Sequence, residues 1–367
     1  MKATARLHEL GQSLWLDNIT RTMLGDGTLR GYIDELSVTG LTSNPTIFDK
    51  AISGGDSYDE QIAELSSSAG LGEGPGANAD EDVFFELALA DLRDATDLFA
   101  GVHQRSDGVD GFCSLEVSPL LADDAGATIA QAAALHAKAE RENLFIKIPG
   151  TEAGRKAIEE TIFAGIPVNV TLLFDAAQYL GSAEAYMRGI ERRIEAGLDP
   201  AVASVASIFM SRWDVAVAGE VGDDLHNRLG IAVGGRAYVA YRELLQSDRW
   251  LRLMNEGARP QRLLWASTGT KDPNASDTLY IEAFASPFTV NTMPEPTLLA
   301  FADHGQVGDL MPADGGNAEQ VLKEFEGAGI DVDALATRLQ VEGKQSFNKS
   351  WEELLSSIAS QRGVTAG

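Results

Sequence analysis

Eight short apolar runs recur along the chain, and polar or amphipathic segments separate them. Several runs are almost continuously apolar, which is typical of parallel strands that are covered on both faces. The runs cover residues 13–19, 38–46, 112–118, 145–150, 167–174, 204–210, 263–268 and 288–293. We therefore predict eight buried strands.

The segments between these runs predict helices. Residues 127–143 are rich in alanine and carry one polar face, while residues 174–196 place apolar side chains at helical spacing before a glycine. Residues 225–245 show a similar pattern. Strands that alternate with helices form a parallel sheet, and eight such units predict a closed (β/α)8 TIM barrel. A doubly wound open sheet is the alternative.

The chain has 367 residues, more than the about 250 residues of a bare barrel, so extra helices are expected. Residues 317–326 predict one short helix, and residues 332–361 predict one or two helices whose apolar face packs on the barrel. A segment rich in Ser, Gly and Ala, residues 66–80, predicts an exposed loop. We expect a single barrel domain over residues 1–367, with the extra helices at about residues 297–367.

Composition narrows the possible functions. Apolar residues make up 44% of the chain, as in soluble globular proteins, and no run approaches the about 20 residues of a membrane span. The formal net charge of −26 argues against partners such as nucleic acid or anionic membranes. The single cysteine, Cys113, allows no internal disulfide, so a reducing cytoplasm is expected. Scattered histidines and the lack of phosphate-binding or dinucleotide motifs predict neither a metal nor a cofactor.

The most informative run is FIKIPG, residues 145–150, which places one amine, Lys147, among apolar side chains. Burial of an unpaired ammonium is costly, so Lys147 either forms a structural ion pair or is a reactive amine. A neutral lysine amine can attack a ketone and form an imine. Apolar neighbours favour the neutral form and nearby carboxylates oppose it. Either desolvation prevails, or one carboxyl keeps its proton.

Every other predicted strand also carries a polar group near one end. Catalytic groups of a barrel gather at the carboxyl ends of its strands, so this convergence favours an active site. The candidates are Asp17, Thr42, Asn44, Glu116, Lys147, Asn169, Thr171, Ser207, Arg212, Ser267, Lys271, Asn291 and Thr292.

Two carboxyls and two cations stand out among these candidates. Asp17 could act as a general base, although it could also cap the next helix or pair with Lys147. Glu116 lies between two apolar residues, which is unusual for packing. Arg212 and Lys271, helped by Ser267, could bind phosphate; ion pairs with Asp214 or Asp272 are the alternative.

Together these residues resemble the transaldolases, in particular a longer bacterial subfamily. The matching segments are LWLDNI, GLTSNPTIF, SLEVSP, FIKIPGTEAG, VNVTLLF, ASIFMSRWD, LLWASTGTKDP and VNTMPE. The resemblance implies a class I aldolase barrel, circularly permuted relative to other such aldolases, with the lysine on the fourth strand. It also implies transfer of a dihydroxyacetone unit between sugar phosphates in the pentose phosphate pathway.

The resemblance implies roles for individual residues. Lys147 would form the Schiff base, Asp17 would remove the C4 hydroxyl proton, and Glu116 would move protons through a water held with Thr171. Dihydroxyacetone would be held by Asn44 and Asn169, in a pocket shared with Thr42 and Ser207. Phosphate would be bound by Arg212, Ser267 and Lys271.

Two other functions remain open at this stage. Related small aldolases release free dihydroxyacetone from fructose 6-phosphate, but they have glutamine in place of Glu116 and tyrosine in place of Phe209. A barrel that binds sugar phosphates without catalysis is the third possibility. The sequence leaves open whether the protein is a monomer or a homodimer.

Overall fold

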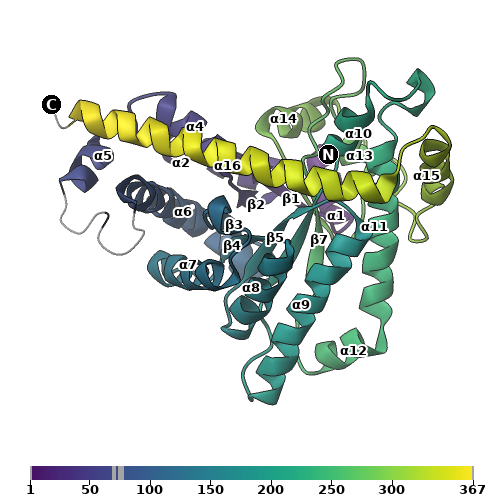
Figure 1. Cartoon of the computed structure of the whole chain (residues 1–367), viewed down its shortest axis with the longest axis horizontal. Helices are drawn as coiled ribbons and strands as arrows, with labels where there is room; N and C mark the ends of the chain where they lie inside the picture. Colours follow the sequence, from purple (N-terminus) through teal and green to yellow (C-terminus); the bar gives the residue numbers. More distant parts are fainter. Residues whose placement is uncertain (1, 68–71, 73–77, 366–367) are drawn as a thin grey trace.

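A computed structural model, which describes residues 2–67, 72 and 78–365, shows eight parallel strands closed into a barrel (Figure 1). Each strand pairs with the next in the chain, and β1 pairs with β8. The strands are β1 Ser13–Asp17, β2 Val38–Thr42, β3 Cys113–Glu116, β4 Leu144–Pro149, β5 Val168–Leu173, β6 Ser204–Phe209, β7 Gln261–Ala266 and β8 Val290–Met293. All eight predicted strands and the predicted barrel are confirmed.

Helices follow each strand and surround the barrel. The helices up to β5 are α1 Ala3–Glu9, α2 Arg21–Gly25, α3 Thr28–Leu36, α4 Pro45–Ser53, α5 Asp59–Ser66, α6 Ala79–Arg105, η1 Pro119–Leu121, α7 Ala125–Ala139 and α8 Glu152–Phe163. The later helices are α9 Ala176–Glu195, α10 Ser211–Val217, η2 Asp223–Leu225, α11 Leu229–Gln246, α12 Asp248–Asn255, α13 Leu279–Ala283, α14 Glu295–His304, α15 Ala318–Gly327 and α16 Val332–Thr365. None of these described helices has the length and apolar character that a bilayer crossing requires.

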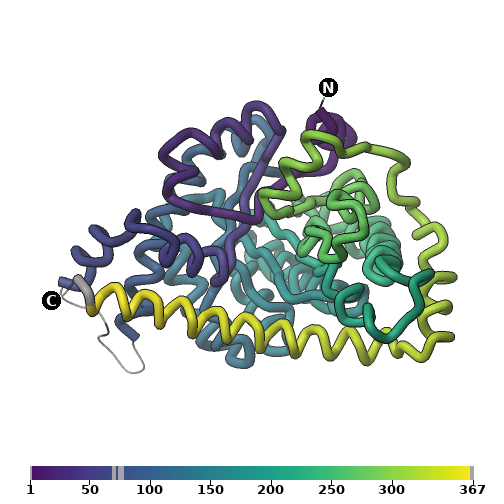
Figure 2. Tube along the Cα trace, turned by 90° about the horizontal axis from the view of Figure 1, so that it is seen from above, coloured from purple at the N-terminus to yellow at the C-terminus, as the bar shows by residue number. Residues whose placement is uncertain are grey.

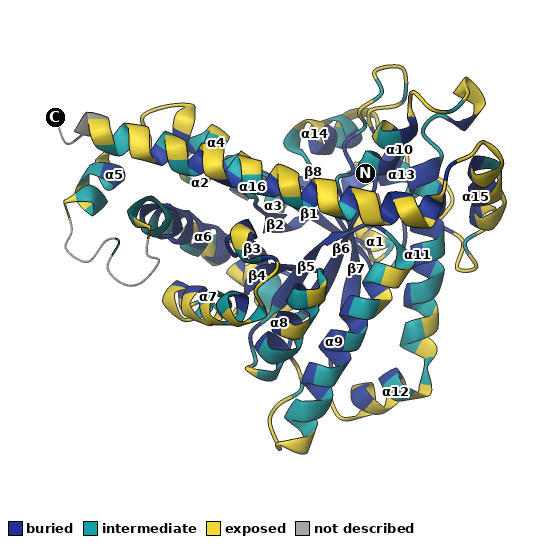
Figure 3. Cartoon of the chain, viewed as in Figure 1, coloured by how far each residue is buried: buried dark blue, intermediate teal, exposed yellow. Residues whose placement is uncertain are grey.

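The barrel strands are buried along almost their whole length, whereas the outer helices expose one stripe each (Figure 3). Side chains that point inward fill the barrel, as where the rings of Trp15 and Phe145 lie 5.9 Å apart. Gly40 on β2 makes room for Trp15, because a Cβ at this position would lie 2.5 Å from the indole nitrogen. The continuous apolar runs of the sequence therefore correspond to strands that are covered on both sides.

The sequence left open whether residues 332–361 form one helix or two, and the structure shows one. Helix α16 runs nearly the whole length of the molecule (Figures 1 and 2). Gly343 lies where this helix passes the end of β5, and a Cβ there would come within 3.0 Å of the Leu172 side chain. Gln340, one turn earlier, donates to the Leu172 carbonyl at 3.0 Å. The glycine thus allows α16 to lie directly on the carboxyl ends of the strands.

Aromatic packing anchors the other half of α16. Trp351 is fully buried, and its ring meets that of Phe84 on α6 edge to face at a centroid distance of 5.0 Å. Phe84 meets Phe48 of α4 in the same way at 5.3 Å. Leu354 and Ile358 continue this buried face of α16. The predicted apolar face is therefore confirmed.

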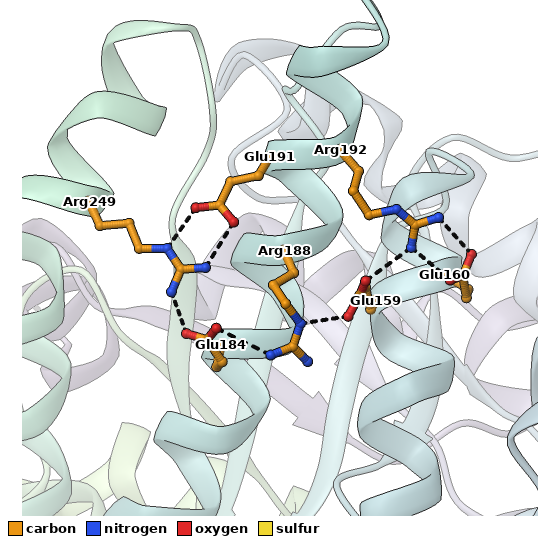
Figure 4. A network of polar contacts seen from close by, with 7 residues as sticks. All are labelled: Glu159, Glu160, Glu184, Arg188, Glu191, Arg192 and Arg249. Atoms are coloured by element: carbon orange, nitrogen blue, oxygen red, sulfur yellow. Dashed lines mark hydrogen bonds and ion pairs between the residues drawn. The ribbon is translucent and has the colours of Figure 1, made fainter.

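Ion pairs connect the three outer helices α8, α9 and α12 (Figure 4). Arg249 of α12 pairs with two glutamates of α9, and two arginines of α9 pair with glutamates of α8. The residues are Glu159, Glu160, Glu184, Arg188, Glu191, Arg192 and Arg249. Each of these partly exposed ion pairs contributes little to the free energy of unfolding. The network therefore fixes the relative positions of the helices more than it stabilises the fold.

Two predicted segments need comment. The loop expected at residues 66–80 lies mostly outside the described residues, and its predicted ends were too wide, because α5 includes Ser66 and α6 begins at Ala79. Helix α14 directly follows β8 and packs against α1, so it completes the eighth strand–helix unit. The helices beyond the barrel repeat are thus α15 and α16.

We predict that Trp351→Ala destabilises the protein and loosens α16. Loss of a fully buried indole should lower the free energy of unfolding by about 3–5 kcal/mol, as measured by urea titration. Val341→Ala, at a residue of the same helix that is 48% exposed, is the control and should change stability by less than about 0.5 kcal/mol. Equal effects of the two substitutions would contradict the packing described here.

Candidate active site

Polar side chains at the carboxyl ends of the strands line a cavity of about 540 Å³. Eleven of the fourteen residues that the sequence indicated lie on its wall: Asp17, Thr42, Asn44, Lys147, Thr171, Ser207, Phe209, Arg212, Ser267, Lys271 and Thr292. Glu116 and Asn169 lie behind the wall and contact residues on it. Asn291 is fully buried on β8, where its Oδ1 accepts from the Thr268 hydroxyl at 3.0 Å. The barrel therefore brings together the groups that the sequence scatters over more than 250 positions.

Lys147 lies on β4 and is 5% exposed. Its Nζ donates to the Ser43 carbonyl at 2.9 Å and lies 3.1 Å from Oε2 of Glu116 on β3. Because β3 pairs with β4 in a register that places Glu116 beside Lys147, this contact follows from the sheet itself. The amine is therefore paired, as the structural interpretation of Lys147 requires, and it also faces a cavity, as a reactive amine would.

Burial raises the pKa of both carboxyls near this amine. For Glu116 the removal of water is the largest influence, and the attraction of Lys147 opposes it without cancelling it. The same holds for Asp17, whose carboxylate Lys147, the Thr42 hydroxyl and Lys271 stabilise to a smaller extent. Of the two possibilities that the sequence left open, these shifts favour the second, in which a carboxyl keeps its proton to higher pH than usual.

Asp17 is held by a chain of hydroxyls. Thr42 donates to Asp17 Oδ1 at 2.7 Å, and its oxygen lies 2.7 Å from that of Thr292 on β8. Asp17 does not cap the following helix, because the Thr20 side chain accepts from Met23 N at the start of α2. The structural alternative of a helix cap is therefore excluded, and the carboxyl faces the cavity.

A second polar chain crosses from β6 to β3. Ser207 donates to Asn169 Oδ1 at 2.7 Å, and Asn169 donates through Nδ2 to Ser114 at 3.1 Å. These bonds fix the orientation of the buried amide. Thr171, next on the same face of β5, is fully buried, and its hydroxyl has no hydrogen-bond partner among the described residues. Such a hydroxyl, on the wall of a polar cavity, suits a bound water or substrate.

Cations gather at one side of the mouth. Arg212 follows β6, and its guanidinium lies 5.2 Å from the ring centre of Phe209. Burial lowers the pKa of Arg212. Neither Arg212 nor Lys271 forms an ion pair within the described part of the chain, because Asp214 accepts from backbone amides of α11 and Asp272 from Asn227. Ser267 has a left-handed conformation with φ 55°, and its hydroxyl oxygen lies 3.0 Å from that of Ser211, the residue before Arg212.

The sequence did not indicate every residue of the site. Ser346, Phe347 and Ser350 of α16 line the mouth, and Phe347 also faces Arg212. The helical spacing of α16 signalled a buried face but not what that face would cover. Lys50 of α4 and Glu295 of α14 also reach the cavity. Glu295 ends the segment VNTMPE and Lys50 follows GLTSNPTIF, but neither residue was assigned a role from the sequence. Within the described residues, no group of three or more His, Cys, Asp or Glu side chains is arranged to hold a metal ion.

Comparison with known proteins agrees with this geometry. A sequence model of the family described as transaldolase/fructose-6-phosphate aldolase matches residues 14–358. A protein named transaldolase from Frankia alni is 44% identical over 368 residues, which cover 98% of this chain and 97% of the relative. This chain belongs to the transaldolase/fructose-6-phosphate aldolase family.

Other relatives in this family are equally complete matches. Proteins named transaldolase from Saccharopolyspora erythraea and Kocuria rhizophila are each 43% identical. The first alignment covers 97% of this chain and 96% of the relative, and the second covers 97% of both. The resemblance inferred from the sequence motifs is confirmed.

We predict that Asp17→Asn stabilises the protein at neutral pH. A carboxyl whose folded pKa is raised stabilises the fold fully only below its ordinary pKa, 3.8 for Asp17, and that contribution is lost as the pH rises through the raised value. The free energy of unfolding of Asp17→Asn, from urea titrations, should therefore exceed that of the wild type by more at pH 7.5 than at pH 4.5. Asp56→Asn, at an exposed position, is the control and should show no such trend.

Proposed function

We propose that this protein is a transaldolase, which transfers a dihydroxyacetone unit from a ketose phosphate to an aldose phosphate. Sedoheptulose 7-phosphate or fructose 6-phosphate would be the donor, and erythrose 4-phosphate or glyceraldehyde 3-phosphate the acceptor. The observation that carries the proposal is the amine of Lys147 at the wall of the cavity, 3.1 Å from Glu116. Family membership adds the reaction class.

In the first half of the reaction, neutral Lys147 Nζ attacks C2 of the donor, and the carbonyl oxygen takes up a proton. The resulting carbinolamine loses its hydroxyl group as water and leaves an imine. Glu116 supplies and removes these protons through a water near the Thr171 hydroxyl, which has no partner among the described residues. The raised pKa of Glu116 favours its protonated form more than usual, which suits a proton donor.

In the second half, Asp17 accepts the proton of the C4 hydroxyl. The C3–C4 bond breaks, the aldose phosphate leaves as an aldehyde, and the bonding electrons enter the imine to give an enamine on Lys147. The enamine keeps the dihydroxyacetone unit and adds to the acceptor aldehyde in the reverse sequence, after which water releases the product. Asn44 and Asn169, which Ser207 orients at 2.7 Å, hold the hydroxyls of the retained unit.

The substrate phosphate occupies the cationic side of the mouth. Arg212, Lys271 and Ser267 line this part of the cavity, and neither cation lies within ion-pair distance of a carboxylate in the described residues. Thr42 positions Asp17 through its 2.7 Å hydrogen bond. The aldolase alternative, release of free dihydroxyacetone, gains no support from Glu116 and Phe209, which the resemblance places on the transferase side.

We expect borohydride reduction in the presence of fructose 6-phosphate to attach a three-carbon unit to Lys147, identified by peptide mass mapping. Lys147→Ala should abolish both labelling and transfer while the circular dichroism spectrum is retained. Lys156→Ala, at an exposed lysine of α8, is the control and should retain both. Labelling of another residue, or transfer by Lys147→Ala, would refute the proposal. Release of dihydroxyacetone at an equal rate without acceptor would favour the aldolase alternative.

We also expect Arg212→Ala to impair recognition of the phosphate specifically. Loss of a charge-assisted hydrogen bond costs about 1.5–3 kcal/mol, so KM for fructose 6-phosphate should rise about 10- to 100-fold. Turnover of unphosphorylated fructose should change by less than about threefold, because no phosphate is lost. Arg236→Ala, whose partner Glu319 lies on the outer helix α15, is the control. A similar loss with both sugars would show that Arg212 does not bind phosphate.

A further inference from the structure

A second cavity opens at the other end of the barrel, where the strands begin. Its volume is about 800 Å³, larger than that of the candidate active site. The wall includes Ser13 and Val38 at the start of β1 and β2, Ser204 at the start of β6, and Arg262 near the start of β7. None of the residues assigned to the transaldolase reaction lies on this wall. The volume falls within the about 300–1,000 Å³ that is usual for small-molecule sites.

The floor of this second cavity carries a buried guanidinium whose hydrogen bonds are incomplete. Arg262 is 9% exposed and donates to the Ser13 hydroxyl at 2.7 Å and to the Val109 carbonyl at 3.3 Å. Its Nη2 atom lies 3.9 Å from Oδ2 of Asp110, which is too far for a hydrogen bond. The Nε proton has no acceptor among the described residues. A guanidinium has five N–H donors, and these two hydrogen bonds use one from each terminal nitrogen.

Asp110 forms only a long ion pair with this cation, at 3.9 Å, and its oxygens accept hydrogen bonds from other donors. Its Oδ1 accepts from Trp15 Nε1 at 2.8 Å and from Gly111 N at 3.1 Å, and its Oδ2 accepts from Ser13. Two further arginines, Arg105 and Arg259, line the same cavity with the neutral His8, against one further acid, Asp34. Arg259 is paired with Asp107, 3.5 Å away, so Arg105 and Arg262 carry most of the local positive charge. In a chain with a formal net charge of −26, this local excess of cations favours an anionic group.

The remaining wall is apolar. Phe145 and Val205 form its inner part, while Phe288 and Val109 stand at the rim with exposures of 68% and 50%. Phe288 holds a left-handed conformation, φ 60°, which is uncommon for a bulky side chain. Apolar and aromatic walls with a few polar groups are usual in pockets that bind small molecules.

We propose that this second cavity binds a small organic anion with an apolar, ring-sized body and one acidic group. The acidic group binds Arg262 at the floor, and the apolar body lies between Phe145 and Phe288. A purely structural role of Arg262, which would only close the barrel floor, accounts for its bonds to Ser13 and Val109. It accounts for neither the free Nε donor nor the exposed aromatic rim.

Fluorescence titration of the full chain with 8-anilinonaphthalene-1-sulfonate tests this proposal. We expect one probe molecule to bind per chain, at least tenfold more tightly than N-phenyl-1-naphthylamine, which has the same rings without the sulfonate. Ala203→Phe, which fills the second cavity, and Phe288→Ala, which removes its rim, should each weaken binding of the anionic probe at least fivefold. Arg262→Lys should reduce the preference for the anionic probe, because lysine lacks the planar array of donors.

Two control variants locate the probe. Leu120→Ala, at a residue that is 51% exposed on η1, and Phe347→Ala, at the mouth of the active-site cavity, should change the dissociation constant by less than twofold. Phe288 is on the surface, so Phe288→Ala should fold normally even if Arg262→Lys does not. Equal affinity for the two probes, or a dissociation constant that Ala203→Phe and Phe288→Ala leave unchanged, would overturn the proposal.

Discussion

Lys147 and Glu116 lie 3.1 Å apart in a part of the barrel where each is only 5% exposed. In such surroundings an isolated charge is costly, so an amine and a carboxyl can remain only if they contact each other or exchange a proton. Parallel pairing of β3 and β4 enforces this contact, because the register sets the two residues side by side. The pair therefore depends on the sheet and not on flexible loops, which suits the attack on a carbonyl proposed for Lys147.

A layer of apolar side chains beneath the candidate site excludes water from that side. Residues two apart on a strand point to the same face, so Trp15, Phe145 and Val205 lie one layer below Asp17, Lys147 and Ser207. Trp15 and Phe145 are each 1% exposed, and Val205 is 2% exposed. This apolar layer separates the active-site cavity from the second cavity at the opposite end of the barrel. The same three strands thus carry the reactive groups, the barrier below them and part of the wall of the second cavity.

Helix α16 covers the open end of the candidate site, and it contacts the barrel at a residue with a strained backbone conformation. Leu172 has a φ of 58° within β5, at an irregularity of the ladder with β6. A non-glycine residue in this conformation costs of order 1–3 kcal/mol and persists only where its surroundings hold it. Gln340 binds the Leu172 carbonyl, and Gly343 packs on its side chain. The contacts of α16 therefore hold β5 in the form that presents Thr171 to the cavity.

The sequence predicted the strands and most of the active site because the relevant signals are local. A polar residue within an apolar run, such as Lys147 in FIKIPG, is visible without any tertiary information, and the barrel topology then brings the strand ends together. The contribution of Phe347 was not predictable in this way, since an apolar residue on an amphipathic helix looks the same whether it covers a core or a substrate.

The residues of the second cavity could not be predicted from the sequence either. Arg262 lies near the start of a strand, where a charge is ordinary, and Phe288 lies in the run that precedes Asn291 and Thr292, so neither residue breaks a local pattern. Only the spatial arrangement reveals that the guanidinium is buried with a free donor while the ring is exposed. A functional residue that departs from the local sequence pattern can therefore be found from the sequence. A site that arises from unusual burial of ordinary residues can be found only in the folded structure.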